Sequence, residues 1–139
     1  MKVRILQTDW PTSEEAIKSV RTAVFVMEQN IPFHIDFDEN DQKAAHWLAL
    51  NNAGLPVGTA RLQHDGHFGR MAVLSDYRNH GIGSLIISSV IKHANRLRLP
   101  PLYLNAQVEA RPFYRRFGFV DTGPLFQEAG IEHQTMRLD

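Results

Sequence analysis

The sequence of 139 residues predicts an α/β (α+β) fold: a mixed, mostly antiparallel twisted sheet of six or seven strands flanked by helices. Three observations predict it. Short apolar or alternating segments, typical of strands, and longer segments of helical periodicity follow in the order βαβββαβαββ. Three strand-like segments lie in succession between residues 45 and 74. A glycine turn at residues 78–83 joins the last of them to the longest amphipathic segment.

The first 41 residues predict a strand, a helix and a loop. Residues 2–8 alternate as in a half-buried strand. The helix begins at residues 11–15, where Thr12 and Glu15 have the spacing of a capping box, and it ends near residues 30–32. Residues 32–41 are acidic and aromatic, which favours a loop with at most a short helix beyond it. One apolar stripe is expected to face the core: Ala16, Val20, Ala23, Val24 and Met27.

The remaining elements follow from turn and breaker residues. Strands are predicted at 45–50, 57–63 and 68–74, then a helix from Gly81 to about Arg98, which two prolines end. A strand at 102–107 precedes a short helix at about 110–117, closed by Gly118, and strands near 119–121 and 132–138 end the chain. One face of the long helix is expected to be buried: Ile82, Leu85, Ile86, Val90, Ala94 and Leu97.

Composition bounds the function. Residues 1–139 are expected to form a single domain, without linkers or repeats. Lys+Arg and Asp+Glu are both 15, so the zero net charge argues against a nucleic-acid partner. The chain has no cysteine, which excludes disulfides, thiolate metal sites and an acyl-cysteine intermediate, and no metal is expected. No apolar run approaches the roughly 20 residues of a membrane span, so a cytoplasmic protein is expected.

The run Arg78-Asn-His-Gly-Ile-Gly-Ser84 predicts a site for a diphosphate. A helix start exposes unpaired N–H groups beside the positive end of the helix dipole. Gly81 and Gly83 lack the Cβ atoms that would keep a diphosphate away, and Arg78 adds a fork-shaped positive charge. A P-loop is excluded because no lysine follows Gly83, and a dinucleotide fingerprint because Ile86 occupies the place of its third small residue.

The pattern Arg-x-x-Gly-x-Gly at a strand-to-helix junction resembles the acyl-CoA loop of the GNAT (GCN5-related N-acetyltransferase) superfamily, and the predicted order of elements resembles its fold. The likeness covers nearly the whole chain and is strongest to the short bacterial ElaA/YjcF-type branch. Five segments carry that likeness: Val24–Asn30, Asp36–Glu39 with His46, Val57–Leu62, Leu104–Gln107 with Phe113-Tyr114, and Phe126–His133.

The resemblance implies acetyl-CoA as co-substrate. The backbone of residues 71–73 would bind the pantetheine arm, and an N–H there would polarise the thioester carbonyl. The plainer alternatives are a core strand for residues 71–73 and a hydrogen-bonded structural amide for Asn105. The implied cofactor-binding set is Met71, Ala72, Val73, Arg78, Asn79, His80, Gly81, Ile82, Gly83, Ser84 and Asn105.

The resemblance also implies catalytic and acceptor residues. Tyr114, in Ala-x-x-Phe-Tyr-x-x-x-Gly-Phe, would protonate the departing thiolate, and core packing is the alternative. The candidate bases are Glu28, His46, Glu128 and His133, with Glu28 and His133 preferred. The implied acceptor wall is Phe25, Glu28, Gln29, Arg61, Gln107 and His133.

Together these features predict an N-acetyltransferase that moves an acetyl group from acetyl-CoA directly to a primary amine in a ternary complex. The alternative is a non-catalytic acyl-CoA sensor or interaction module on the same fold. The acceptor is a small-molecule or protein amine, and a homodimer is possible. Five acids between residues 28 and 41 form either a solvated loop or a negatively charged mouth that attracts amines.

Overall fold

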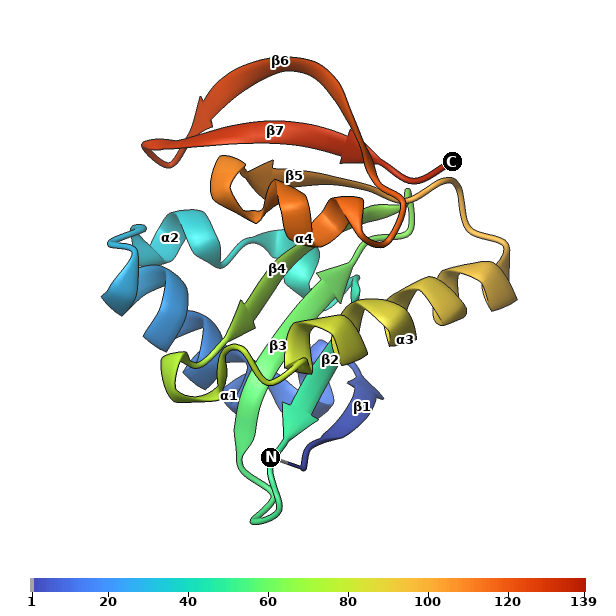
Figure 1. Ribbon diagram of the computed structural model, residues 1–139. Helices are drawn as coiled ribbons and strands as arrows, with labels where there is room; N and C mark the ends of the chain where they lie inside the picture. Colours follow the sequence, from blue (N-terminus) through green and yellow to red (C-terminus); the bar gives the residue numbers. More distant parts are fainter. Residues whose placement is uncertain (1) are drawn as a thin grey trace.

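Seven strands form one sheet in the order β1-β2-β3-β4-β5-β7-β6 in the computed structural model, which describes residues 2–139 (Figure 1). All neighbouring strands are antiparallel except β4 and β5, which are parallel. The predicted fold class and order of elements are therefore confirmed. The strands are β1 (Arg4–Thr8), β2 (Ala45–Leu50), β3 (Pro56–Leu62), β4 (His67–Val73), β5 (Tyr103–Gln107), β6 (Val120–Glu128) and β7 (Ile131–Arg137).

Helices cover both faces of this sheet (Figure 1). On one face lie α1 (Trp10–Arg21), the π-helical segment η1 (Thr22–Glu28) and α2 (Phe33–Asp36). On the other lie α3 (Ile82–Leu97) and α4 (Arg111–Arg115). Because successive strand residues point to opposite faces, each face has its own core: Trp47 packs under α3, whereas Leu48 packs under α1. Short 3₁₀ turns complete the chain: Glu39–Gln42, Ser75–Tyr77 and Val108–Ala110.

The first helix differs from its prediction at both ends. Its N-cap is Asp9, whose carboxylate accepts a hydrogen bond from the Thr12 N–H at 2.9 Å, so the proposed capping box is wrong. Beyond Arg21 the helix widens to π geometry, which turns the apolar stripe out of its expected phase. Met27 is consequently 72% exposed, and Phe25 is buried instead.

Two further segments correct the prediction. Residues 32–41 are not a loop but contain α2 and a 3₁₀ turn, and β6 extends to Glu128 instead of ending at residue 121. In α3, Leu85 and Leu97 are exposed, whereas Ile87 and His93 are buried. Leu85 lies at the edge of the predicted stripe and Leu97 in the last turn of α3, so neither reaches the sheet. Within residues 2–139, no helix is long and apolar enough to cross a membrane.

Candidate functional site

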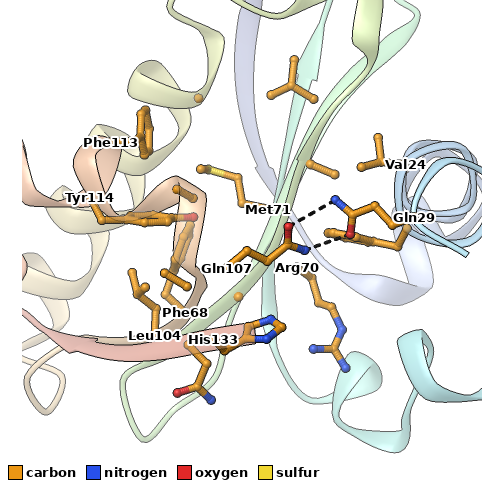
Figure 2. Close-up of a pocket in the computed structure, with 18 of the residues that line it drawn as sticks. Val24, Gln29, Phe68, Arg70, Met71, Leu104, Gln107, Phe113, Tyr114 and His133 are labelled. Atoms are coloured by element: carbon orange, nitrogen blue, oxygen red, sulfur yellow. Dashed lines mark hydrogen bonds between the residues drawn. The ribbon is translucent and has the colours of Figure 1, made fainter. Parts of the chain in front are cut away.

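The candidate site is a cavity of about 780 Å³ at the point where β4 and β5 diverge (Figure 2). These strands pair only at His67–Tyr103 and Phe68–Leu104. Beyond Phe68 the facing edge of β4 has no strand partner, so its backbone N–H and C=O groups border the opening. Such an edge can pair with an extended ligand as a further strand would. The predicted residues Met71, Ala72, Val73 and Asn105 all line the cavity.

A β-bulge shapes the wall formed by β4. Thr59 pairs with Ala72 and Arg61 with Gly69, so two residues of β4, Arg70 and Met71, oppose one residue of β3. Arg70 has φ +51°, a conformation that is strained for a side chain larger than glycine's. The extra residue places Arg70 on the α2 face of the sheet, while Met71 packs into the core under α3.

The glycine loop lies at one end of the cavity. Gly81 adopts φ +78° just before the first turn of α3, and this turn directs its N–H groups towards the cavity end. A Cβ at Gly83 would lie 3.3 Å from the ring of Phe113, so a larger residue would fill the cradle. His80 is exposed and does not line the cavity. The predicted loop residues that line it are Arg78, Asn79, Gly81, Ile82, Gly83 and Ser84.

Arg78 has a protein partner that the sequence did not reveal. Its Nη1 and Nη2 atoms donate to the two carboxylate oxygens of Glu28 at 2.6 and 2.7 Å, and its Nε donates to the Val73 carbonyl at 2.9 Å. The hydrogen bonds from Arg78 lower the pKa of Glu28. Glu28 lies outside the cavity lining. A carboxylate that is already paired and more acidic than usual is poorly suited to take a proton from an amine.

Tyr114 lies across the cavity from Gln29, and its side chain points inward (Figure 2). Phe68, Phe113 and Phe119 surround its ring at centroid distances of 5.1–6.3 Å. Burial raises the pKa of Tyr114, so the phenol stays protonated at neutral pH. Its hydroxyl makes no hydrogen bond to any residue between 2 and 139. The hydroxyl is therefore available to a molecule in the cavity.

The α2 face of the cavity gathers the other predicted acceptor residues. Phe25, Gln29, Gln107 and His133 line it. Gln29 and Gln107 bond through their side-chain amides at 2.8 Å, although 78 positions separate them in the chain. The Nδ1 atom of His133 lies 2.6 Å from the Ile131 carbonyl, an acceptor, so Nδ1 carries the proton. That tautomer leaves Nε2 of His133 as a proton acceptor.

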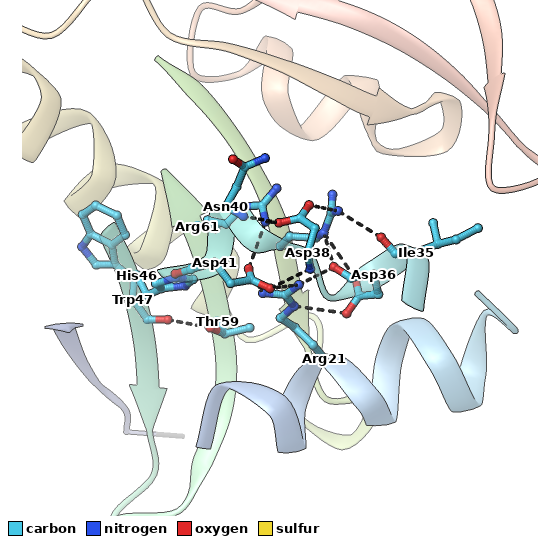
Figure 3. A network of polar contacts seen from close by, with 11 residues as sticks. Arg21, Ile35, Asp36, Asp38, Asn40, Asp41, His46, Trp47, Thr59 and Arg61 are labelled. Atoms are coloured by element: carbon cyan, nitrogen blue, oxygen red, sulfur yellow. Dashed lines mark hydrogen bonds and ion pairs between the residues drawn. The ribbon is translucent and has the colours of Figure 1, made fainter. Parts of the chain in front are cut away.

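Arg61 does not lie in this wall. It is 3% exposed, does not line the cavity, and donates to Asp38 and Asp41 at 2.8 and 2.9 Å (Figure 3). His46, the third base candidate, is fully buried, its Nε2 bonds the Asp41 carbonyl, and burial lowers its pKa. Neither residue can reach a substrate in the cavity. The predictions of Arg61 as an acceptor residue and of His46 as a candidate base are therefore wrong. Among the described residues, no cluster of side chains could hold a metal ion.

The five acids between residues 28 and 41 do not form one solvated loop or one negative mouth: Glu28 and Glu39 are exposed, whereas the aspartates belong to a buried or half-buried network. Asp36 and Asp41 are 3% and 1% exposed and pair with Arg21, which is fully buried (Figure 3). Arg61 and Arg70 complete a network of three arginines and three aspartates, the third being Asp38. The charges balance, as burial of ionised groups requires. Burial raises the pKa of Asp36 and acts the same way on Asp41, but hydrogen bonds from Arg21 and Arg61 outweigh it and lower the pKa of Asp41.

Sequence reasoning missed several residues of the cavity, notably Arg70 and Gly69. The cavity exposes Arg70 because a bulge turns it out of the regular alternation, and no local pattern of residue types signals a bulge there. Arg116, which directly follows α4, and Ile35 of α2 also line the cavity. Their places depend on how these short helices pack, which periodicity does not specify.

Comparisons with known proteins agree with this geometry. A family model described as Acetyltransferase (GNAT) domain matches residues 12–139. The chain is 34% identical over 134 residues to the uncharacterized N-acetyltransferase YjcF of Bacillus subtilis, covering 91% of this chain and 95% of that protein. It is 32% identical over 126 residues to the protein ElaA of Escherichia coli, covering 85% and 82%.

Solved structures share the whole fold. An acyl-CoA N-acyltransferase from Pseudomonas aeruginosa superposes with a TM-score of 0.88 at 28% sequence identity, over 99% of this chain and 100% of that one. The agreement therefore extends over nearly the whole length of both chains.

Proposed function

Because the chain belongs to the acetyltransferase (GNAT) family, in the branch of YjcF and ElaA, we propose that it transfers an acetyl group from acetyl-CoA directly to a primary amine. One observation carries the proposal. The glycine loop that begins α3, the divergent edge of β4 and the hydroxyl of Tyr114 border a single cavity. These are an anion site, a backbone edge for an amide-containing arm and a proton donor, in one continuous space.

The residues at the loop end fit a diphosphate. Gly81 and Gly83 leave the backbone N–H groups of the first turn of α3 open, and a Cβ at Gly83 would close the approach. Arg78 lies beside them, and its side chain is 36% exposed. Acetyl-CoA supplies the acyl group as an activated thioester. The N–H groups of residues 71–73 would bind its arm and polarise its carbonyl, a contribution of about 3–4 kcal/mol in related acyl transfers.

We assign the acid to Tyr114 and the base to His133. His133 takes a proton from the amine at Nε2, the nitrogen forms its bond to the acyl carbon as the C–S bond breaks, and Tyr114 gives its proton to the sulfur. Proton exchange with solvent then restores both side chains. General acid catalysis and general base catalysis each raise the rate of such a reaction about 100-fold or more. Holding both substrates together supplies much of the remaining rate enhancement.

Glu28, the other predicted base, is assigned here as the partner of Arg78. The two roles predict opposite results for Glu28→Gln. A lost base would slow turnover about 100-fold, whereas a lost ion-pair partner frees the guanidinium for phosphate and leaves turnover within about threefold. Measuring kcat and CoA affinity for this variant therefore separates them. His133→Gln should slow turnover about 100-fold and leave CoA affinity unchanged.

The experiment that tests the function uses acetyl-CoA, a panel of primary amines and detection of free thiol. Thiol released only in the presence of particular amines, with the acetylated amine found by mass spectrometry, is the expected result. Tight CoA binding without transfer to any amine would contradict it and favour the sensor. Absence of CoA binding would overturn both. A cytoplasmic location and a homodimer stay predictions.

A further inference from the structure

The acceptor half of the cavity contains two opposite charges whose use the proposed reaction does not explain. Gln107 pairs with His133 across β5 and β7, so their side chains share a face, and Gln29 of the η1 side contacts Gln107 on that same face. The charged residues lining this side are Arg70, Asp36 and Glu128. Asp36 already forms ion pairs with Arg21 and Arg70. Two groups remain: Nη1 of Arg70, a hydrogen-bond donor without a partner among residues 2–139, and the negative carboxylate of Glu128.

Arg70 is held rigidly and still has donors to spare. Its Nε donates to the Asp36 carbonyl at 3.0 Å and lies 3.4 Å from the Asp36 carboxylate. Its Nη2 donates to Asp38 at 3.1 Å and to the Ile35 carbonyl at 3.4 Å. Its Nη1 has no partner within residues 2–139, and the side chain remains 25% exposed. A planar guanidinium fixed along one edge offers the free edge to a carboxylate at little entropic cost.

The negative group is the carboxylate of Glu128, the last residue of β6 before the turn to β7. Its carboxylate lies 3.7 Å from Nε2 of His133, the proposed base, and is 51% exposed. An ammonium group bound there is placed to lose its first proton to His133, which passes that proton to solvent before it takes the second one during acyl transfer. Glu128 therefore attracts the charged form of the amine to the residue that must neutralise it.

Charge balance favours an acceptor that carries both a carboxylate and an amine. The charges of the three arginines and three aspartates in the network that includes Arg70 already sum to zero. An added anion alone would therefore bring an uncompensated charge. A zwitterion adds no net charge. A plain alkylamine offers no acceptor to Nη1 of Arg70, whereas a carboxylate would supply one.

We infer that the acceptor is a small aminocarboxylic acid, whose carboxylate binds Nη1 of Arg70 while its amine lies at His133 and Glu128. The inference rests on the proposed function and adds the substrate class. Gly69 gives the acceptor room, because nothing lies within 4 Å of where its Cβ would be. Arg70 is in these terms a specificity-determining residue and takes no part in proton transfer.

The test compares each common amino acid with its carboxamide, which keeps the amine and loses the anion. Thiol release is measured with acetyl-CoA, and kcat/KM is expressed per concentration of free amine. The wild-type protein should prefer the carboxylate at least tenfold for its best acceptor. In Arg70→Gln this ratio should fall to within threefold, and Arg70→Lys should keep part of it. Arg115→Gln, which alters an exposed arginine paired with Asp121, is the matched control.

Binding provides the second measurement, by NMR line broadening of the amino acid in the presence of CoA. CoA affinity shows that each variant is folded. Equal use of carboxylates and carboxamides by the wild type, or an unchanged preference in Arg70→Gln, would overturn the inference and leave the proposed function standing. Carboxylate-selective binding without thiol release would support the site and overturn the enzyme. Neither binding nor release would overturn both.

Discussion

Replacing Gly83 by valine should abolish tight CoA binding without unfolding the protein. A Cβ at this position would lie 3.3 Å from Cζ of Phe113 and 3.7 Å from Cε of Met71, both of which line the cavity. The backbone of Gly83 is helical, so a side chain brings no backbone strain, and valine has the better helix propensity, but the ring of Phe113 must shift by a few tenths of an ångström. Stability should therefore change by no more than about 1 kcal/mol.

The loss of affinity follows from the hydrogen bonds that the extra methyl groups prevent. A diphosphate kept from the first turn of α3 loses about two charge-assisted bonds from backbone N–H groups. At about 1.5 kcal/mol each, the affinity for CoA falls about 100-fold. Isothermal titration calorimetry with CoA measures this fall, and thermal unfolding of the same samples measures the stability.

Gly81→Ala is the matched control for this prediction. Its Cβ would meet nothing within 4 Å, but Gly81 has φ +78°, which costs an alanine about 1–2 kcal/mol. This variant should therefore lose more stability than Gly83→Val and, where still folded, keep more of its CoA affinity. Wild-type affinity in Gly83→Val would refute the assignment of the loop to the diphosphate.

Three other predictions test different parts of the molecule. Tyr114→Phe should lower kcat about 100-fold and leave CoA affinity and stability nearly unchanged, and full thiol release at every pH would contradict the acid assignment. Burial lowers the pKa of His46 below its usual 6.5, so the unfolded chain binds more protons and the free energy of unfolding falls as pH drops below about 6.5. The contribution of His46 to this loss of unfolding free energy reaches at most about 1.4 kcal/mol at pH 5.5. Urea unfolding should show that His46→Gln removes this contribution, whereas the control His34→Gln, at an exposed site, keeps it. Arg21→Met removes one of the two arginine partners of each of two buried carboxylates and leaves the network one positive charge short, so it should cost about 3–5 kcal/mol of unfolding free energy by denaturant titration, whereas Arg115→Met at an exposed pair should cost less than about 1 kcal/mol.

The donor half of the molecule could be predicted from the sequence because its signals are local. The strand, the glycine turn and the helix that follow one another at residues 68–97 are adjacent in the chain, and the turn needs φ > 0 at Gly81. Tyr114 belongs to a short motif with a glycine to close its helix. The strand, turn and helix meet because they follow one another in the chain, and a motif of its own identifies Tyr114, although its ring packs against the distant Phe68.

The acceptor half could not be predicted in the same way because its contacts are distant in the chain. The carboxylate of Glu28 meets Arg78 fifty positions later, and Gln29 meets Gln107 seventy-eight positions later. The π-helical widening of η1 decides which side of that segment faces the cavity, and helical periodicity at 3.6 residues per turn does not foresee it. Arginine is a residue type that often binds substrates, but the aspartates that pair with Arg61 and bury it come from a different segment of the chain.

The strain at Arg70 links the two halves. Glycine at φ +51° would avoid a cost of about 1–2 kcal/mol, yet an arginine occupies the bulge. Its side chain offsets that cost with bonds to α2 and to Asp38, which a glycine could not make. The same bonds fasten α2, on the proposed acceptor side of the cavity, to β4, the strand that we propose binds the thioester arm. Since buried ion networks add little net stability, we infer that the value of this one is geometric: it sets the distance between the proposed acceptor site and β4.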